Sequence, residues 1–140
     1  MARRSRGDFK LRGILRRIGN QMESDLRPAM VKAANLVLAT QQELMPVDSG
    51  EAKQALQAFV SKSGLDAQIG IRGKRANKKV FYAIFIERGT KQYQRGDSVI
   101  AARPAHPWLR PSVDLNRDDI VRLIRAAITS TLARAAGEAR

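Results

Sequence analysis

The chain has 140 residues, of which 44% are hydrophobic and none is cysteine, and its formal net charge is +13. This length suits one domain with a modest core, and the absence of cysteine excludes disulfides, zinc–thiolate sites and cysteine nucleophiles. The longest apolar run, Val80 to Ile86, is too short to cross a bilayer, and no apolar segment with a cleavage site follows the basic N-terminus, so we expect neither a membrane span nor a secretory signal.

The positive charge is concentrated in two segments. Residues 1–19 carry seven Lys/Arg against one Asp, residues 71–95 carry eight against one Glu, and the rest of the chain sums to zero. Such clustering indicates a surface that meets nucleic-acid phosphates or an acidic protein; a solvated basic face with a disordered tail is the alternative. Because aromatic residues are not interleaved with these charges, any DNA contact would be to the backbone. The candidate contact residues are Arg3, Arg4, Arg6, Arg12, Arg16, Arg17, Arg72, Lys74, Arg75, Lys78 and Lys79.

The first predicted element is a long helix from about Phe9 to Met45, where apolar residues recur at helical spacing. Pro28 lies inside this segment and has no backbone N–H to donate. The helix therefore either kinks near Pro28 or restarts there, with Ser24 or Asp25 as its N-cap.

A short helix is expected next. Asp48 and Glu51 are three residues apart, as in a capping box, in which each side chain accepts a hydrogen bond from an otherwise unpaired amide at a helix start. We expect this helix to run to about Leu56.

The following residues predict a β-hairpin. Residues 58–61 and 67–71 have strand character, and Gly64 in the connection can supply a positive φ. Apolar residues alternate with others along 67–71, which is typical of a sheet with one buried face. Such a sheet needs a helix as cover.

The central part of the chain is harder to interpret. Residues 72–79 are expected to form a basic loop. From Val80 to Thr90 the pattern fits either a short helix ending at Gly89 or a buried strand, and we favour the helix. Residues 91–101 are polar and predict an exposed loop, with a short strand at 99–101 that packs against the sheet.

A proline-rich connector, residues 102–111, leads to the last helix. Apolar residues from Ile120 to Ala135 make one stripe, which predicts an amphipathic helix. Its start is either Pro111 in the first helical position or Asn116 as N-cap.

These elements predict an α+β fold. It would have a long N-terminal helix, a small antiparallel sheet built on a hairpin, and an amphipathic C-terminal helix packed on the sheet. We expect a single domain over residues 9–136, preceded by a flexible basic arm (1–8) and followed by a short tail (137–140).

The sequence offers little for catalysis. His106 is the only histidine and is flanked by prolines, which favours a structural or exposed role over a catalytic one. The acidic residues Asp114, Asp118 and Asp119 are better explained as charge at a helix N-terminus than as a metal site. No phosphate-binding glycine loop is present. We therefore expect no catalytic residues, no metal and no cofactor.

Glu87 follows an apolar run and would sit at the edge of the core. An unpaired carboxylate there is costly, so an arginine partner is expected, either Arg103 or Arg110. The alternative is a solvated glutamate at a helix end.

Three motifs occur in order along the chain. Pro46-Val47-Asp48-Ser49-Gly50 looks like a P-x-D-[ST]-G turn, Tyr82-Ala83 through Glu87-Arg88-Gly89-Thr90 looks like Y-A-x-x-x-E-x-G-T, and Ala102-Arg103-Pro104 through Trp108-Leu109-Arg110-Pro111 looks like A-R-P-F-L-x-P-A. Together, over roughly residues 25–135, they resemble the tail-component family of siphophage neck or tail-completion proteins. The matching residues are Pro46, Asp48, Gly50, Tyr82, Glu87, Gly89, Thr90, Arg103, Pro104, Leu109 and Pro111. The chain departs from the family pattern by inserting Ala105-His106-Pro107, by Trp108 in place of phenylalanine, and by Ala52 in place of a leucine.

The resemblance implies a non-enzymatic α+β subunit of a six- or twelvefold ring between capsid connector and tail. Its partners would be further copies of itself, connector or head-closure proteins, tail-terminator or tail-tube proteins, and the backbone of DNA in the channel. It would reside in the virion, and in the host cytoplasm during assembly. Trp108 and Leu109 would anchor an interface or lock the connector to the core, and we favour the core. The alternative function is a basic, non-enzymatic DNA-binding protein or regulator.

Overall fold

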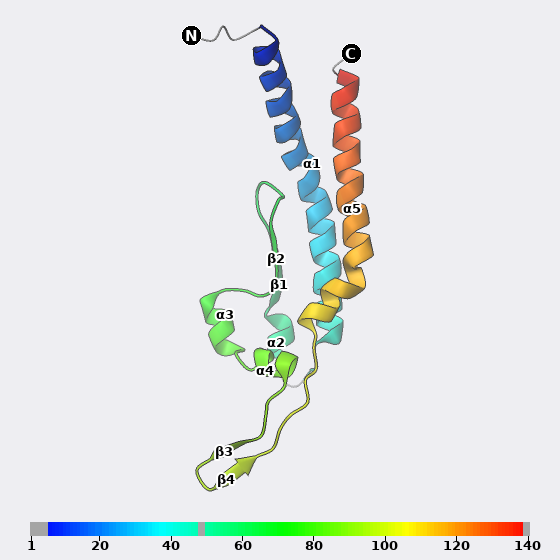
Figure 1. Cartoon of the computed structure of the whole chain (residues 1–140). Coiled ribbons are helices and arrows are strands. Elements are labelled where there is room, and N and C mark those ends of the chain that lie inside the picture. The colour runs from blue at the N-terminus through cyan, green and yellow to red at the C-terminus, as the bar shows by residue number, and fades with distance from the viewer. Residues whose placement is uncertain (1–5, 48–49, 139–140) are drawn as a thin grey trace. The chain divides into compact units, whose positions relative to one another are not determined.

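The computed structural model of the chain describes residues 6–47 and 50–138 (Figure 1). Residues 1–5 of the expected arm, Asp48 and Ser49 of the expected turn, and the last two residues of the expected tail lie outside the described residues. The elements are α1 (Arg6–Leu44), α2 (Glu51–Gln54), β1 (Leu56–Val60), β2 (Ala67–Ile71), α3 (Lys74–Lys79), α4 (Ala83–Arg88), β3 (Tyr93–Arg95), β4 (Ser98–Ile100) and α5 (Leu109–Glu138). The α+β fold predicted from the sequence is confirmed.

Helix α1 is continuous through Pro28, so the alternative of a restart at this proline is wrong. The pyrrolidine ring is exposed, while Leu26 and Ala29 on the other face are buried. Packing of that buried face holds the helix together across the one backbone hydrogen bond that proline cannot make.

The chain forms two compact units, and both α1 and α5 contribute to each of them. The first unit comprises the residues up to 33, residues 60–67 and the residues from 119 onward; the second comprises residues 34–59 and 68–118.

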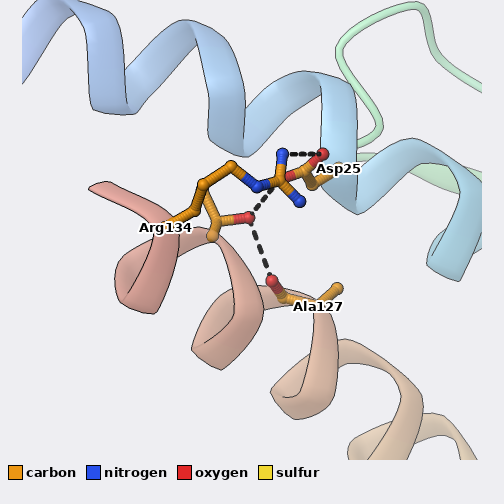
Figure 2. Close-up of polar contacts among 4 residues, drawn as sticks. Asp25, Ala127 and Arg134 are labelled. Atoms are coloured by element: carbon orange, nitrogen blue, oxygen red, sulfur yellow. Dashed lines mark hydrogen bonds and ion pairs between the residues drawn. The ribbon is translucent and has the colours of Figure 1, made fainter. Parts of the chain in front are cut away.

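In the first unit, polar contacts join α1 to α5 (Figure 2). The hydroxyl of Thr131, which is fully buried, lies 2.6 Å from Oδ2 of Asp25 and 3.0 Å from the carbonyl oxygen of Ala127. Arg134 Nη1 lies 3.3 Å from Asp25 Oδ2. Asp25 therefore serves as an inter-helix contact rather than as an N-cap.

The turn of the β1–β2 hairpin also belongs to the first unit and lies against α1. Gly64 has φ of +73°, as the sequence predicts, and a Cβ at this position would come within 2.6 Å of the Arg27 backbone. Glycine is thus required both for the turn and for the close approach.

The core of the second unit gathers one or two residues from each of several short elements. Its buried members are Met45, Ala52, Leu56, Val80, Ala83 and Trp108. The long helices meet here through a polar contact as well, because Asn116 Nδ2 donates to Thr40 Oγ1 at 2.7 Å. Asn116 lies inside α5, so its predicted role as N-cap is wrong. Pro111 lies in the first turn of α5, two residues after its start at Leu109.

Two further expectations are wrong in the central segment. Residues 74–79 form helix α3 rather than a loop, because Lys, Arg and Ala are good helix formers and Ala76 is half-buried. Residues 91–101 contain a second antiparallel hairpin, in which β4 pairs with β3 and not with the β1–β2 sheet. Gly96, with φ of +59°, opens its two-residue turn.

Candidate interaction surface

The proline-rich connector is fixed at its end by Glu87. Oε2 of Glu87, in the last turn of α4, accepts hydrogen bonds from the backbone N–H groups of Trp108 at 2.6 Å and Leu109 at 2.9 Å. The first amides of a helix lack partners within it and favour a negative charge, so this carboxylate caps α5. The expected ion pair with an arginine is wrong, because neither Arg103 nor Arg110 pairs with Glu87 where the structure describes all three.

The start of the connector is fixed by the residues that follow α4. Thr90 and Arg103 form an antiparallel bridge through two backbone hydrogen bonds of 3.0 and 2.9 Å. A Cβ on Gly89, which has φ of +70°, would come within 2.7 Å of the Arg103 carbonyl oxygen. A glycine is required there because the connector backbone passes directly over it.

Two neighbouring connector residues differ in their surroundings. Trp108 is 4% exposed, and its indole Nε1 lies 3.4 Å from the carbonyl oxygen of Ala83. It therefore locks the connector to the core of the second unit. Leu109 is 41% exposed, and its side chain lies over the backbone of Gly70.

The connector, α4 and the second hairpin enclose a cleft with a volume of about 580 Å³. It is lined by Pro46, Tyr82, Phe85, Ile86, Thr90, Tyr93, Ile100, Arg103, Pro104 and His106. Most of these side chains are apolar, and Arg103 supplies a cation. The lining includes residues from all three sequence motifs, which are separated by tens of residues in the chain. The structure therefore brings the motifs together at one place.

An apolar patch continues from the cleft over the outer face of α4. Phe81, Ile84 and Phe85 are 63%, 49% and 50% exposed, and the rings of Phe81 and Phe85 meet edge to face with centroids 6.2 Å apart. Exposed apolar surface of this kind marks interaction sites. We did not predict this patch from the sequence; the signal was an apolar run with no polar face in a segment assigned to a helix.

The basic candidate residues fall into two groups. In the second unit, the Arg72 guanidinium stacks 3.9 Å from the Phe59 ring centroid, and Lys79 pairs with Glu51 at 3.3 Å. Lys74, Arg75 and Lys78 are exposed on α3, and none of them forms an ion pair with another described residue.

The remaining basic candidates belong to the first unit or lie outside it. Arg12, Arg16 and Arg17 are exposed on α1, and Arg6 is its first residue. Arg3 and Arg4 lie outside the described residues. The structure thus assigns the two basic segments of the sequence to different units.

The acidic residues of α5 are not at its N-terminus. Asp118 and Asp119 lie in the interior of α5, because the helix begins at Leu109; Asp119 instead pairs with Arg122 one turn later. Across residues 6–47 and 50–138, no three potential metal ligands of the His, Cys, Asp or Glu type come together. In the same residues, no helix has an apolar stretch long enough to span a bilayer.

Comparison of the chain with protein-family models, with curated proteins and with solved structures found no match. The chemistry of the surface is therefore judged from its geometry. An apolar cleft with one cation in its wall can hold an apolar side chain that lies next to a carboxylate. Such a cleft suits a protein partner.

Proposed function

We propose that this chain is a structural, non-enzymatic subunit of the neck of a tailed phage or phage-like particle. In this role it is a tail-completion ring subunit that joins the capsid connector to the tail and forms part of the DNA channel. The observation that carries the proposal is the cleft lined by Pro46, Tyr82, Thr90, Arg103 and Pro104, which come from the three motifs of the family that the sequence resembles.

The way in which the connector is fixed supports an assembly role. The connector is held by the Glu87 cap, by the Thr90–Arg103 bridge and by the bond from the His106 amide to the Ile86 carbonyl oxygen at 2.8 Å. A surface that is rigid before binding loses less conformational entropy when it meets a neighbour. A fixed apolar surface beside a cleft suits subunits that must dock repeatedly in one geometry.

The proposed partners follow from this role. They are further copies of the chain in a six- or twelvefold ring, the adjacent connector or head-closure protein, and a tail-terminator or tail-tube protein. The proposed location is the virion neck, with the host cytoplasm as the place of assembly.

A second function, a basic non-enzymatic DNA-binding protein or regulator, is favoured by one observation. Three cations on α3 are exposed and lack an ion-pair partner among the described residues. Such a surface binds phosphates without reading base sequence. The same cations serve the neck proposal if they face DNA in the channel.

Native mass spectrometry and negative-stain imaging of the purified full chain test the proposal. We expect ring-shaped oligomers of one fixed copy number, formed either by the protein alone or after addition of head or tail components. A protein that stays monomeric or dimeric under both conditions contradicts the ring role and leaves the DNA-binding alternative.

A further inference from the structure

The cleft of the second unit is not filled by the chain that forms it. Its lining residues come from positions 46–106, and none of them belongs to α5. Its volume of about 580 Å³ lies in the range of about 300–1,000 Å³ found for clefts that bind ligands. The cleft is therefore open to an occupant from outside.

The same unit exposes an apolar side chain that nothing in the described chain covers. Leu115, in the second turn of α5, is 70% exposed, the highest value among the described large hydrophobic residues. Asp114 precedes it and Asp118 follows one turn later; both are exposed and form no ion pair with a described residue. At these spacings the three side chains share one side of the helix. We name them the α5 acidic face.

We propose that the cleft of one subunit receives the α5 acidic face of a second copy. In this contact Leu115 enters the apolar part of the cleft, and Asp118 or Asp114 meets Arg103 in its wall. The inference rests on the proposed function, because it identifies the two surfaces through which ring subunits join.

Charge complementarity selects this occupant from within the chain. Arg103 forms no ion pair with a described residue, and the neighbouring Lys91 and Arg95 are also exposed and unpaired in the described chain. Two copies of a chain with a net charge of +13 repel each other unless an acidic surface meets a basic one. The α5 acidic face places two unpaired carboxylates beside an exposed leucine.

The other exposed apolar stretch with helical spacing fits the cleft less well. Phe9, Leu11 and Leu15 of α1 are 61%, 55% and 58% exposed, but Lys10, Arg12 and Arg16 lie between and beside them. Docking this stretch would bring like charges to Arg103, which costs free energy.

The symmetry of the contact agrees with a ring. The cleft and the α5 acidic face are different surfaces, so each subunit donates one and accepts with the other. Such a heterologous contact joins subunits head to tail and generates a closed ring when the rotation per subunit closes. An isologous dimer would not use the two surfaces in this way.

Cross-linking tests the contact directly, because the natural chain contains no cysteine. We would mix a Tyr93→Cys chain with a Leu115→Cys chain and add a short bis-maleimide. We expect heterodimers from the mixture, and a ladder of oligomers when both substitutions are in one chain. Leu132→Cys is the matched control: Leu132 is also an α5 leucine and is 49% exposed, but it lies outside the proposed face. A cross-linked product with Leu132→Cys as strong as with Leu115→Cys overturns the proposal.

A charge exchange tests the specific pairing. We expect Asp118→Arg and Arg103→Glu each to weaken self-association at least about tenfold, as loss of a close interfacial charge pair does. The double variant should recover most of this loss, because the reversed charges again attract; additive losses contradict the pairing. Urea unfolding of each variant shows whether the fold is retained.

The outcomes separate this inference from the proposed function. Rings that form without a cross-link between positions 93 and 115, or introduced cysteines that react only with an added head or tail protein, overturn the interface and leave the ring role standing. Specific cross-links in open chains without rings support the interface and contradict the ring role. A chain that does not self-associate at any concentration overturns the interface.

Discussion

Glu87 joins two segments that lie far apart in the sequence, because a carboxylate in α4 accepts the first two amides of α5. A hydrogen bond to a charged group contributes about 1.5–3 kcal/mol, more than one between neutral groups. The bond fixes the point at which the connector becomes a helix. It also explains the spacing of two family motifs, since the glutamate of one motif caps the helix that begins inside the other.

We therefore expect Glu87→Ala to lower the free energy of unfolding by about 2 kcal/mol, because two amides at the start of α5 lose their partner. Glu87→Gln should cost about half as much, since an amide oxygen still accepts but without the charge. Arg103→Ala is the control and should leave stability nearly unchanged. Urea unfolding followed by circular dichroism measures all three, and a loss from Arg103→Ala equal to that from Glu87→Ala would restore the ion pair between them.

At the scale of elements, the long and periodic segments were predictable and the short ones less so. Helix α5 and strand β2 follow their apolar patterns, and the 80–88 segment is the favoured helix. Helix α3 was missed because its residues have helix propensity without an apolar face. The pairing of β4 with β3 was missed because three-residue strands carry almost no periodic signal.

The site was predictable only in part, for a related reason. The motif residues were named from sequence, but their meeting in one cleft depends on tertiary packing. The exposed patch of Phe81 and Phe85 was hidden because an apolar run suggests burial. An interaction surface is the place where that rule fails.

The contact between α1 and α5 in the first unit gives a prediction at the same scale. Thr131→Val preserves shape but removes a fully buried hydroxyl that contacts Asp25, so we expect a loss of about 1–2 kcal/mol in the free energy of unfolding. Thr129→Val, at an exposed position of the same helix, is the matched control and should have little effect. Chemical denaturation compares the two, and equal losses would show that the hydroxyl contact does not stabilise this pair of helices.

At the scale of the whole molecule, charge and apolar surface have different roles. The net charge of +13 comes from two segments that belong to different units, whereas the cleft and the α5 acidic face lie in one unit. Assembly and contact with a polyanion can therefore be disrupted separately. A variant that loses one property and keeps the other is the sharpest probe of how the chain works.

Salt dependence of DNA binding tests the role of the charge. We expect the full chain to bind duplex DNA of any sequence, with an affinity that falls steeply as salt rises, because each neutralised phosphate contributes a slope of about −0.9 in log K against log salt. Replacing Lys74, Arg75 and Lys78 together by alanine should reduce the slope by about 2–3. Replacing the exposed residues Lys32, Arg117 and Arg125 by alanine removes the same charge outside the basic segments and should change the slope less. Equal effects of the two triple variants would assign DNA binding to net charge alone, and a flat salt response would exclude phosphate contact, so that α3 would then face an acidic protein.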